Sequence, residues 1–248
     1  MKVVFHPDFY QVYTSDPAAA KGRMEAVVKA VEPFAEFVTA EMADHNDVAA
    51  VHTEAHIDEV RRQRLYPIAM LAAGGAVQAA QIGLTEPCFA LIRPPGHHAS
   101  ADASWGFCYF NNMAVAVESL KNRGRIDTAC VLDIDLHYGD GTVNILGGKP
   151  YVMVHNVEAM RRDAYLREVE DAMDRCEADI IGISAGFDNH MEDWGGLLAT
   201  DDYFEIGKMA VQAARRNRGG CFAVLEGGYN HNVLGQNALA LMKGMAAG

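Results

Sequence analysis

The sequence predicts a single-domain, three-layer α/β/α protein built on a parallel sheet. Short apolar segments rich in β-branched residues alternate with longer amphipathic segments along all 248 residues. The short segments are almost continuously hydrophobic, which is typical of strands that helices cover on both faces. Polar residues directly follow several of these strands, at the edge where open parallel sheets bind ligands. We therefore expect one doubly wound domain over residues 1–248.

Seven short runs have the length and the β-branched or aromatic content of buried strands. The expected strands are Val3–Phe5, Val48–Val51, Phe89–Ile92, Ala129–Ile134, Tyr151–His155, Ile180–Ser184 and Cys221–Leu225.

Longer stretches between these runs repeat their apolar residues with helical spacing. The expected helices are Arg23–Val38, Ile57–Leu65, Ile68–Ile82, Asn111–Lys121, Arg161–Cys176, Tyr203–Arg216 and Asn232–Met245. No Pro/Ser-rich linker, repeat or low-complexity segment divides the chain, which favours one domain.

The composition narrows the choice of partners and compartment. The chain has 33 acidic and 21 basic residues, a formal charge of −12, which argues against nucleic-acid binding through a basic surface and mildly favours cationic substrates. No signal peptide or membrane-length apolar run is visible, so we expect a cytoplasmic protein without a membrane partner. The cysteines are odd in number and form no C-x-x-C pair, which predicts free, buried thiols in a reducing compartment.

A metal site is predicted after the strand that ends near residue 134. Asp133, Asp135 and His137 are spaced two apart, so on extended backbone their side chains point to one side. Two carboxylates and an imidazole in one place need a cation, and oxygen and nitrogen ligands suit a catalytic Zn²⁺. Asp188, at the end of a neighbouring strand, supplies a third ligand. The alternative is a solvated acidic loop or a helix cap.

Two adjacent histidines, His97 and His98, follow another strand, after Gly96 in a Pro-rich loop. Histidines that face a metal suggest proton transfer, and each needs a carboxylate to fix its tautomer. Asp133 and Asp140 are the acids nearby that are not assigned to the metal. Tyr229 follows Gly227-Gly228, which favours an exposed turn and a functional hydroxyl over a core tyrosine.

These residues lie in motifs that resemble the histone deacetylase/acetylpolyamine amidohydrolase superfamily. The motifs are R-P-P-G-H-H (93–98), G-F-C-Y-F-N-N (106–112), D-I-D-L-H-Y-G-D-G-T (133–142), S-A-G-F-D (184–188) and E-G-G-Y (226–229). The segments D-Y-F-E-I-G-K (202–208) and E-G-G-Y-N-H-N-V-L-G-Q-N (226–237) look closer to the acetylpolyamine branch.

The resemblance implies the arginase–deacetylase fold and a zinc-dependent hydrolysis of an acetyl-amide. The substrate would be an acetylpolyamine, acetyl-lysine or another acylated small amine, split into acetate and free amine. By analogy His98 would accept the proton of water, although the division of roles between the two histidines stays open. The implied residue roles are Zn²⁺ on Asp135, His137 and Asp188; pairs His97–Asp133 and His98–Asp140; oxyanion stabilisation by Tyr229; and an acyl tunnel bordered by Gly106 and Phe107.

Three departures from the family pattern bear on the site. The segment after Tyr151–His155 passes almost directly into a helix, so a tunnel wall facing Phe107 is expected to be missing. The site would then be open, or completed by a second subunit in a homo-oligomer. Trp194 stands where relatives often carry leucine, and either walls the pocket or caps the core. The family's structural K⁺ uses a serine at the position assigned here to Met153, and methionine is a weak K⁺ ligand.

Two alternatives to a deacetylase are kept. An arginase-like ureohydrolase shares the fold, but its two-metal centre needs further acidic ligands than Asp188 provides. A non-catalytic binding or scaffolding protein of the same fold is the other, and the presence of every catalytic position speaks against it.

Overall fold

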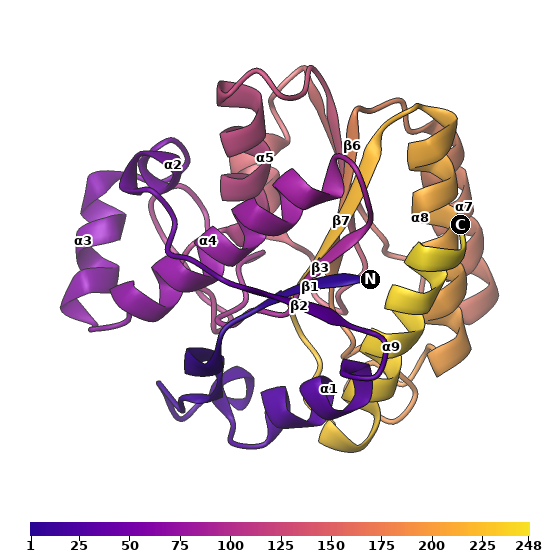
Figure 1. Ribbon diagram of the computed structural model, residues 1–248, viewed down its shortest axis with the longest axis horizontal. Helices are drawn as coiled ribbons and strands as arrows, with labels where there is room; N and C mark the ends of the chain where they lie inside the picture. The colour runs from indigo at the N-terminus through magenta and orange to yellow at the C-terminus, as the bar shows by residue number, and fades with distance from the viewer.

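Seven parallel strands form one sheet in the computed structural model, which describes residues 1–248 (Figure 1). The strands are β1 (Lys2–Phe5), β2 (Glu36–Thr39), β3 (Cys88–Ala90), β4 (Ala129–Asp133), β5 (Val152–Asn156), β6 (Ile180–Ala185) and β7 (Gly220–Leu225). Their order across the sheet is β2-β1-β3-β7-β6-β4-β5, and every neighbouring pair is parallel. The predicted fold class is confirmed.

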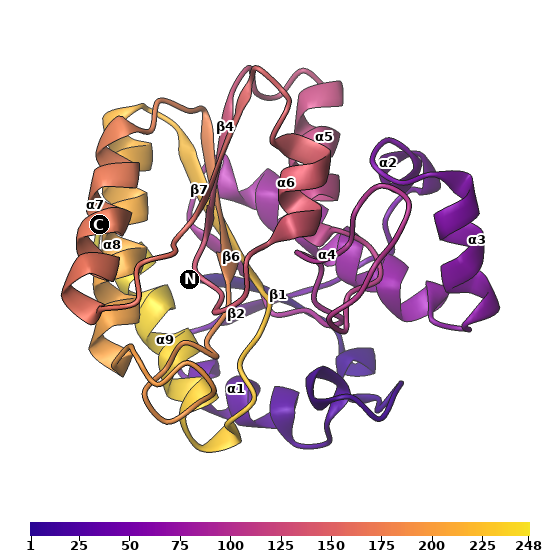
Figure 2. The same cartoon turned by 180° about the vertical axis from the view of Figure 1, so that it is seen from behind.

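Helices cover both faces of this sheet, as Figures 1 and 2 show from opposite sides. One group consists of α4 and α5 with the short α6, and the other packs α1, α9, α8 and α7 in succession. The helices are α1 (Arg23–Val31), α2 (His45–Ala49), α3 (Glu54–Arg62), α4 (Tyr66–Gly83), α5 (Asn112–Asn122), α6 (Asp140–Leu146), α7 (Arg162–Arg175), α8 (Thr200–Arg216) and α9 (His231–Ala247).

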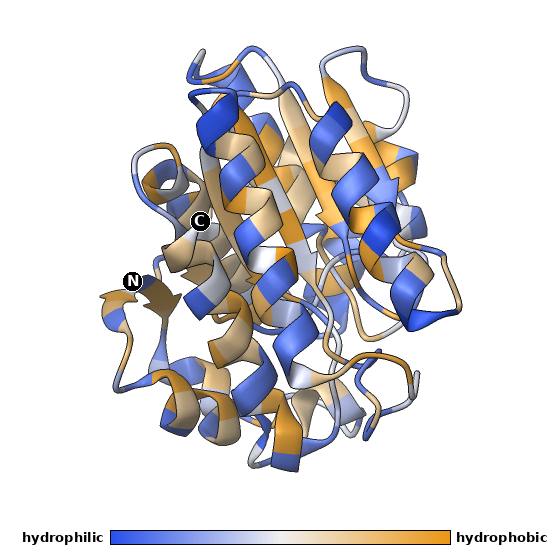
Figure 3. Cartoon of the chain, turned by 90° about the vertical axis from the view of Figure 1, so that its right-hand side faces the viewer, coloured by the Kyte–Doolittle hydropathy of each residue, from blue (hydrophilic) through white to orange (hydrophobic).

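The core lies between the sheet and the two helix layers. Strands β4, β6 and β7 are buried along their whole length, and in Figure 3 the hydrophilic residues of the covering helices lie mainly on their outer sides. This accounts for the nearly continuous hydrophobic character of these strands. None of the helices combines the length and apolar character needed to cross a membrane. The prediction of free, buried thiols is confirmed for Cys88, Cys108, Cys130, Cys176 and Cys221.

Two predicted elements are wrong. Val48–Val51 is not a strand: α2 contains Val48, and the Asp44 side chain caps that helix by accepting a hydrogen bond from the backbone N–H of Asn46 at 2.8 Å. The first long helix stops at Val31 instead of Val38, because Pro33 cannot continue an α-helix. The chain then forms β2, an edge strand that is largely exposed and so lacks the apolar signature of its buried neighbours.

The strand order explains where the polar loops meet. Strands β3, β7, β6 and β4 are consecutive neighbours in the sheet. The loops that follow them therefore leave the sheet side by side at its carboxyl edge, although the sequence separates them by up to about half the chain length.

Candidate active site

The three predicted metal ligands converge at the carboxyl edge of β4 and β6. One ligand atom from each of Asp135, His137 and Asp188 lies within 4.8 Å of the others. The His137 Nδ1 is 3.1 Å from Asp135 Oδ1 and 3.0 Å from Asp188 Oδ2. Both aspartates are buried, whereas the imidazole reaches toward solvent. The predicted grouping of these residues is therefore present in the structure.

The environment of Asp188 tests whether a cation fits between these groups. Its Oδ1 accepts a hydrogen bond from the backbone N–H of Leu136 at 3.0 Å, whereas its buried Oδ2 faces His137 Nδ1 at 3.0 Å and accepts no backbone hydrogen bond. Burial raises the pKa of Asp188 to about 7, and hydrogen bonds to Asp135 and Asp188 raise the pKa of His137 to about 10. Two buried carboxylates that meet at one imidazole nitrogen fit a divalent metal with oxygen and nitrogen ligands.

Two glycines allow this close packing of carboxylates. A Cβ atom on Gly186 would lie 2.1 Å from Asp135 Oδ2, and a Cβ atom on Gly227 would lie 2.5 Å from the same oxygen. The backbone N–H of Gly227 also donates a hydrogen bond to that oxygen at 2.9 Å. Glycine is required at both positions because no larger residue leaves room for the carboxylate.

The inner histidine–aspartate pair, His97 and Asp133, is buried inside the protein. His97 Nδ1 is 3.1 Å from Asp133 Oδ2, and the other oxygen of Asp133 accepts a hydrogen bond from the backbone N–H of Asp135. The His97 Nε2 is 3.8 Å from Asp135 Oδ1. Burial opposes a charge on the ring, but the carboxylates of Asp135 and Asp133 outweigh it and hold the pKa of His97 well above its usual value.

The outer histidine–aspartate pair, His98 and Asp140, reaches the surface only through Asp140, since His98 is buried. His98 Nδ1 is 2.7 Å from Asp140 Oδ1, and Asp140 is the first residue of α6. Burial and the neighbouring His97 lower the pKa of His98 to about 4, so its ring is neutral near pH 7. Gly106 lies directly beneath this ring: a Cβ atom there would be 2.3 Å from His98 Cδ2. Both predicted histidine–aspartate pairs are thus present as neighbours.

An aromatic wall stands beside the metal ligands. The ring of Tyr229 stacks on Trp194 with a centroid separation of 4.0 Å and meets the edge of Phe107 at 6.0 Å. Trp194 also approaches the His137 ring at 6.1 Å. Because Trp194 is about half exposed, it lies at the mouth of the site and does not cap the core. Burial, followed by the charge of Asp135, raises the pKa of Tyr229, so its hydroxyl stays protonated at neutral pH.

Three residues at the site were missed by the sequence reasoning. Buried Glu226 accepts hydrogen bonds from the backbone N–H groups of Gly96 and His97. Buried Arg23 donates to the carbonyl oxygens of Glu226 and Gly228 and so holds the loop that carries Tyr229. Trp105 donates its indole N–H to Asp140 and stacks on His98. Glu226 and Trp105 lie inside or next to quoted motifs, but a motif does not reveal what a side chain contacts.

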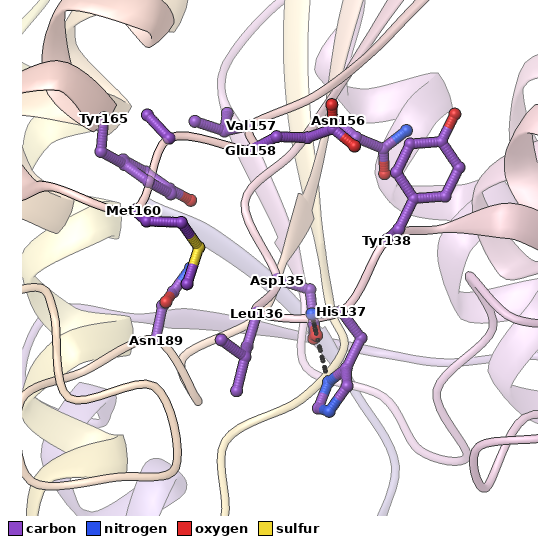
Figure 4. Close-up of a pocket in the computed structure, with 11 residues that line it drawn as sticks. Asp135, Leu136, His137, Tyr138, Asn156, Val157, Glu158, Met160, Tyr165 and Asn189 are labelled. Atoms are coloured by element: carbon purple, nitrogen blue, oxygen red, sulfur yellow. Dashed lines mark hydrogen bonds and ion pairs between the residues drawn. The ribbon is translucent and has the colours of Figure 1, made fainter.

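The side of the site nearest β5 is open. A cavity of about 210 Å³ is lined by Asp135 and His137 on one side and by the loop after β5 on the other (Figure 4). Met160, in that loop, is 83% exposed. No aromatic side chain of this loop faces Phe107, because the segment 157–161 that joins β5 to α7 contains none.

The predicted counterpart of the K⁺-binding serine is wrong. The β4–β5 register pairs Met153 with Cys130, three residues before the end of β4, and places Asn156 beside Asp133. The Asn156 side-chain oxygen accepts a hydrogen bond from the backbone N–H of Gly139 at 2.7 Å. The weak affinity of methionine for K⁺ is therefore no argument against a K⁺ site here. K⁺ binding stays a prediction of the resemblance.

Several proteins named as deacetylases or amidohydrolases are similar to this chain. A "probable deacetylase" of Methanothermobacter thermautotrophicus is 29% identical, covering 98% of this chain and 90% of the relative. Another from Archaeoglobus fulgidus is 30% identical over 91% of this chain and 77% of its own length. An acetylpolyamine amidohydrolase of Burkholderia pseudomallei is 31% identical over 71% of this chain and 60% of the relative. The crystal structure of the HDA15 HD domain superimposes with a TM-score of 0.85 at 22% identity, covering 99% of this chain and 89% of that one.

These matches also locate the shortened region. The match to the Methanothermobacter protein extends over 302 positions, more than the 248 residues of this chain, so the relative contains segments that this chain lacks. The histone deacetylase domain model matches in two parts, residues 17–165 and 157–245, which overlap over residues 157–165, directly after β5. This overlap includes the loop at the open side of the site. Because this family model matches most of the chain, the chain belongs to the histone deacetylase domain family.

Proposed function

We propose that the protein is a zinc-dependent deacetylase that hydrolyses the acetyl-amide of an acetylated amine to acetate and the free amine. The observation that carries this proposal is the convergence of two buried carboxylates, Asp135 and Asp188, on His137 Nδ1, with one ligand atom of each residue within 4.8 Å of the others. Two histidine–aspartate pairs stand beside that position. The names of the relatives, which include deacetylases and an acetylpolyamine amidohydrolase, agree with this chemistry.

Asp135, His137 and Asp188 would hold one Zn²⁺, and the rest of the site would handle protons. When bound, the ion would supply a Lewis acid that polarises the acetyl carbonyl and makes water more acidic. Asp140 engages Nδ1 of His98, which leaves Nε2 as the nitrogen that can accept a proton. His97 stands next to it, with ring centroids 4.0 Å apart, and is the second group able to carry a proton.

Tyr229 would stabilise the oxyanion that forms as the carbonyl is attacked. Its raised pKa keeps the hydroxyl protonated, as a hydrogen-bond donor must be. Arg23 and Asp193 fix the loop around it, Asp193 by accepting the backbone N–H of Tyr229 at 2.8 Å. Phe107 and Trp194 contact the tyrosine ring and would form the wall along which the acyl-amine approaches.

The substrate class follows from charge and openness. The chain carries a net charge of −12, which mildly favours a substrate that keeps a positive charge, such as an acetylpolyamine with a further free amine. Acetyl-lysine, whose acetylated side chain is neutral, is the other candidate. The open side next to β5 leaves room for a substrate broader than a narrow tunnel admits, unless a second subunit closes it. We place the enzyme in the cytoplasm. No observation favours the ureohydrolase or the binding-protein alternative.

Acetate release tests the proposal. Wild-type protein supplied with Zn²⁺ is assayed on acetylspermidine and on an acetyl-lysine peptide, with Tyr229→Phe as the comparison. Losing one oxyanion donor is expected to lower kcat by about 10²–10³-fold. Equal turnover by Tyr229→Phe would contradict the role of Tyr229. Zinc-loaded protein that binds both substrates and hydrolyses neither would favour the binding protein instead.

A further inference from the structure

Trp105 makes two contacts with the outer histidine pair. Its indole Nε1–H donates a hydrogen bond to Asp140 Oδ2 at 2.8 Å. Its ring also lies on the His98 ring, with a centroid separation of 3.9 Å and an interplanar angle of 31°. Trp105, Asp140 and His98 thus form a closed triangle, since Asp140 Oδ1 is 2.7 Å from His98 Nδ1.

The exposure of Asp140 explains why this triangle matters. The side chain of Asp133, the partner of His97, is 1% exposed, and the surrounding backbone determines its orientation. The side chain of Asp140 is 46% exposed. A carboxylate on the surface can rotate and exchange its partners with water, and a histidine that loses its carboxylate loses its fixed tautomer.

We infer that Trp105 is a positioning residue, which fixes the rotamer of Asp140 and thereby the tautomer of His98. The indole nitrogen can only donate, so it occupies one oxygen of Asp140 and leaves the other to accept Nδ1–H of His98. The unshared electron pair of His98 is then on Nε2, the nitrogen not engaged by Asp140. The tryptophan acts through Asp140 and the His98 ring.

The stacked indole has a second effect on the same ring. An aromatic face attracts a cation, and tryptophan is the strongest of the aromatic residues in this respect. When His98 accepts a proton at Nε2, the imidazolium forms against the face of Trp105. The indole therefore supports both the orientation of the base and the charge that it acquires.

Kinetics separate this role from that of a pocket wall. Trp105→Phe keeps an aromatic ring and removes the N–H, and Trp105→Ala removes both. We expect kcat to fall about tenfold for the first and about a hundredfold for the second, with KM within about twofold. Phe37→Leu, on the distant edge strand β2, is the matched control for an exposed aromatic residue. A rise in KM with unchanged kcat would overturn the inference.

An Asp140→Asn background shows whether the N–H acts through Asp140. Adding Trp105→Phe to Asp140→Asn should change kcat by less than about twofold, because the coupling has already been lost. A full tenfold further loss would show that the indole acts by another route.

The tautomer of His98 provides a test that needs no turnover, whereas the kinetic arm rests on the proposed function. Nitrogen-15 NMR of the histidine rings should show His98 as the single Nδ1–H tautomer in the wild type and as a mixture in Trp105→Phe. The same single tautomer in both proteins would overturn the inference. If the wild type hydrolyses no acyl-amine, the proposed function fails, and the NMR result still decides the role of Trp105.

Discussion

The two histidine–aspartate pairs of the site contain the same residue types, but the protein holds them by different means. Asp133 ends the buried strand β4, and His97 Nδ1 and the Asp135 N–H engage its two side-chain oxygens. Asp140 begins a short helix at the surface, and Trp105 engages the oxygen that His98 leaves free. The inner pair is oriented by the sheet itself, whereas the outer pair depends on side chains from loops.

This difference teaches where changes should affect folding and where they should affect turnover. A buried charged group that has lost its partner carries a large desolvation penalty, whereas ion pairs of exposed carboxylates contribute little to stability. Substitutions in the inner pair should therefore lower both the activity and the free energy of unfolding. Substitutions in the outer pair should lower the activity with little change in the free energy of unfolding.

The largest effect is expected from removing the inner carboxylate. Asp133→Ala leaves the Asp135 N–H and His97 without their partner, and should lower the free energy of unfolding by about 3–5 kcal/mol. Asp140→Ala should lower it by less than about 1 kcal/mol. Urea denaturation with Zn²⁺ present measures both, with Asp127→Ala as the control for a fully exposed acid. Equal losses at the two positions would remove the basis of the comparison.

The next largest effect is a dependence of stability on pH. It is expected from His52, which anchors the loop that carries Trp105. Buried His52 donates Nδ1–H to the carbonyl oxygen of Ser100 at 3.0 Å and accepts the N–H of Asn111 at Nε2 at 2.9 Å. Burial and the neighbouring His56 lower the pKa of His52 from 6.5 to about 4. The unfolded chain therefore binds a proton between these values that the folded chain does not. Stability is full above pH 6.5 and falls as the pH drops toward 4.

The loss should reach about 3 kcal/mol at the acid end of this range. Thermal melts of wild type and His52→Gln between pH 7 and 4 measure it. The glutamine variant should be less stable at pH 7 but should have a flatter dependence. Parallel curves for the two proteins would show that another group titrates.

A change at Asp140 should affect turnover more than stability. Asp140→Asn is expected to lower kcat about 10–100-fold, because the partner of a functional histidine sets its tautomer. The zinc content should match that of the wild type, since Asp140 is not a ligand in this site. A loss of zinc in this variant would mean that the outer pair belongs to the metal site.

The smallest effect is expected at the open side of the site. Met160 is almost fully exposed next to the cavity, so Met160→Ser should change the free energy of unfolding by less than about 0.5 kcal/mol. If the open side admits substrate, KM for a bulky acyl-amine should change while KM for acetylspermidine does not. A shift in oligomeric state on gel filtration would instead indicate that a second subunit covers this side.

The sequence predicted the metal ligands and the buried acid Asp133 better than the contacts around His98 and Asp140. β4 ends at Asp133, so the expected extended backbone does not continue: Asp135 and His137 lie in a bend directly after it. Asp188 follows the neighbouring strand β6, and the strand order therefore brings the three ligands together. Trp105 acts through contacts between loops, and Asn156, at the end of β5, through one hydrogen bond to a loop. Loop geometry has no periodic signal in the sequence. The same limit explains the wrong alignment of Met153 and the missed edge strand β2, whose exposed residues follow no apolar pattern.

The central claim is that Asp135, His137 and Asp188 form one zinc site that supports hydrolysis. Metal analysis by mass spectrometry of wild type and Asp188→Ala, both purified without chelator and checked for folding by circular dichroism, tests it most directly. We predict about one Zn²⁺ per wild-type chain and almost none in the variant. A wild type that takes up no zinc at saturation, a variant that keeps a full equivalent, or two Mn²⁺ per chain would contradict the account.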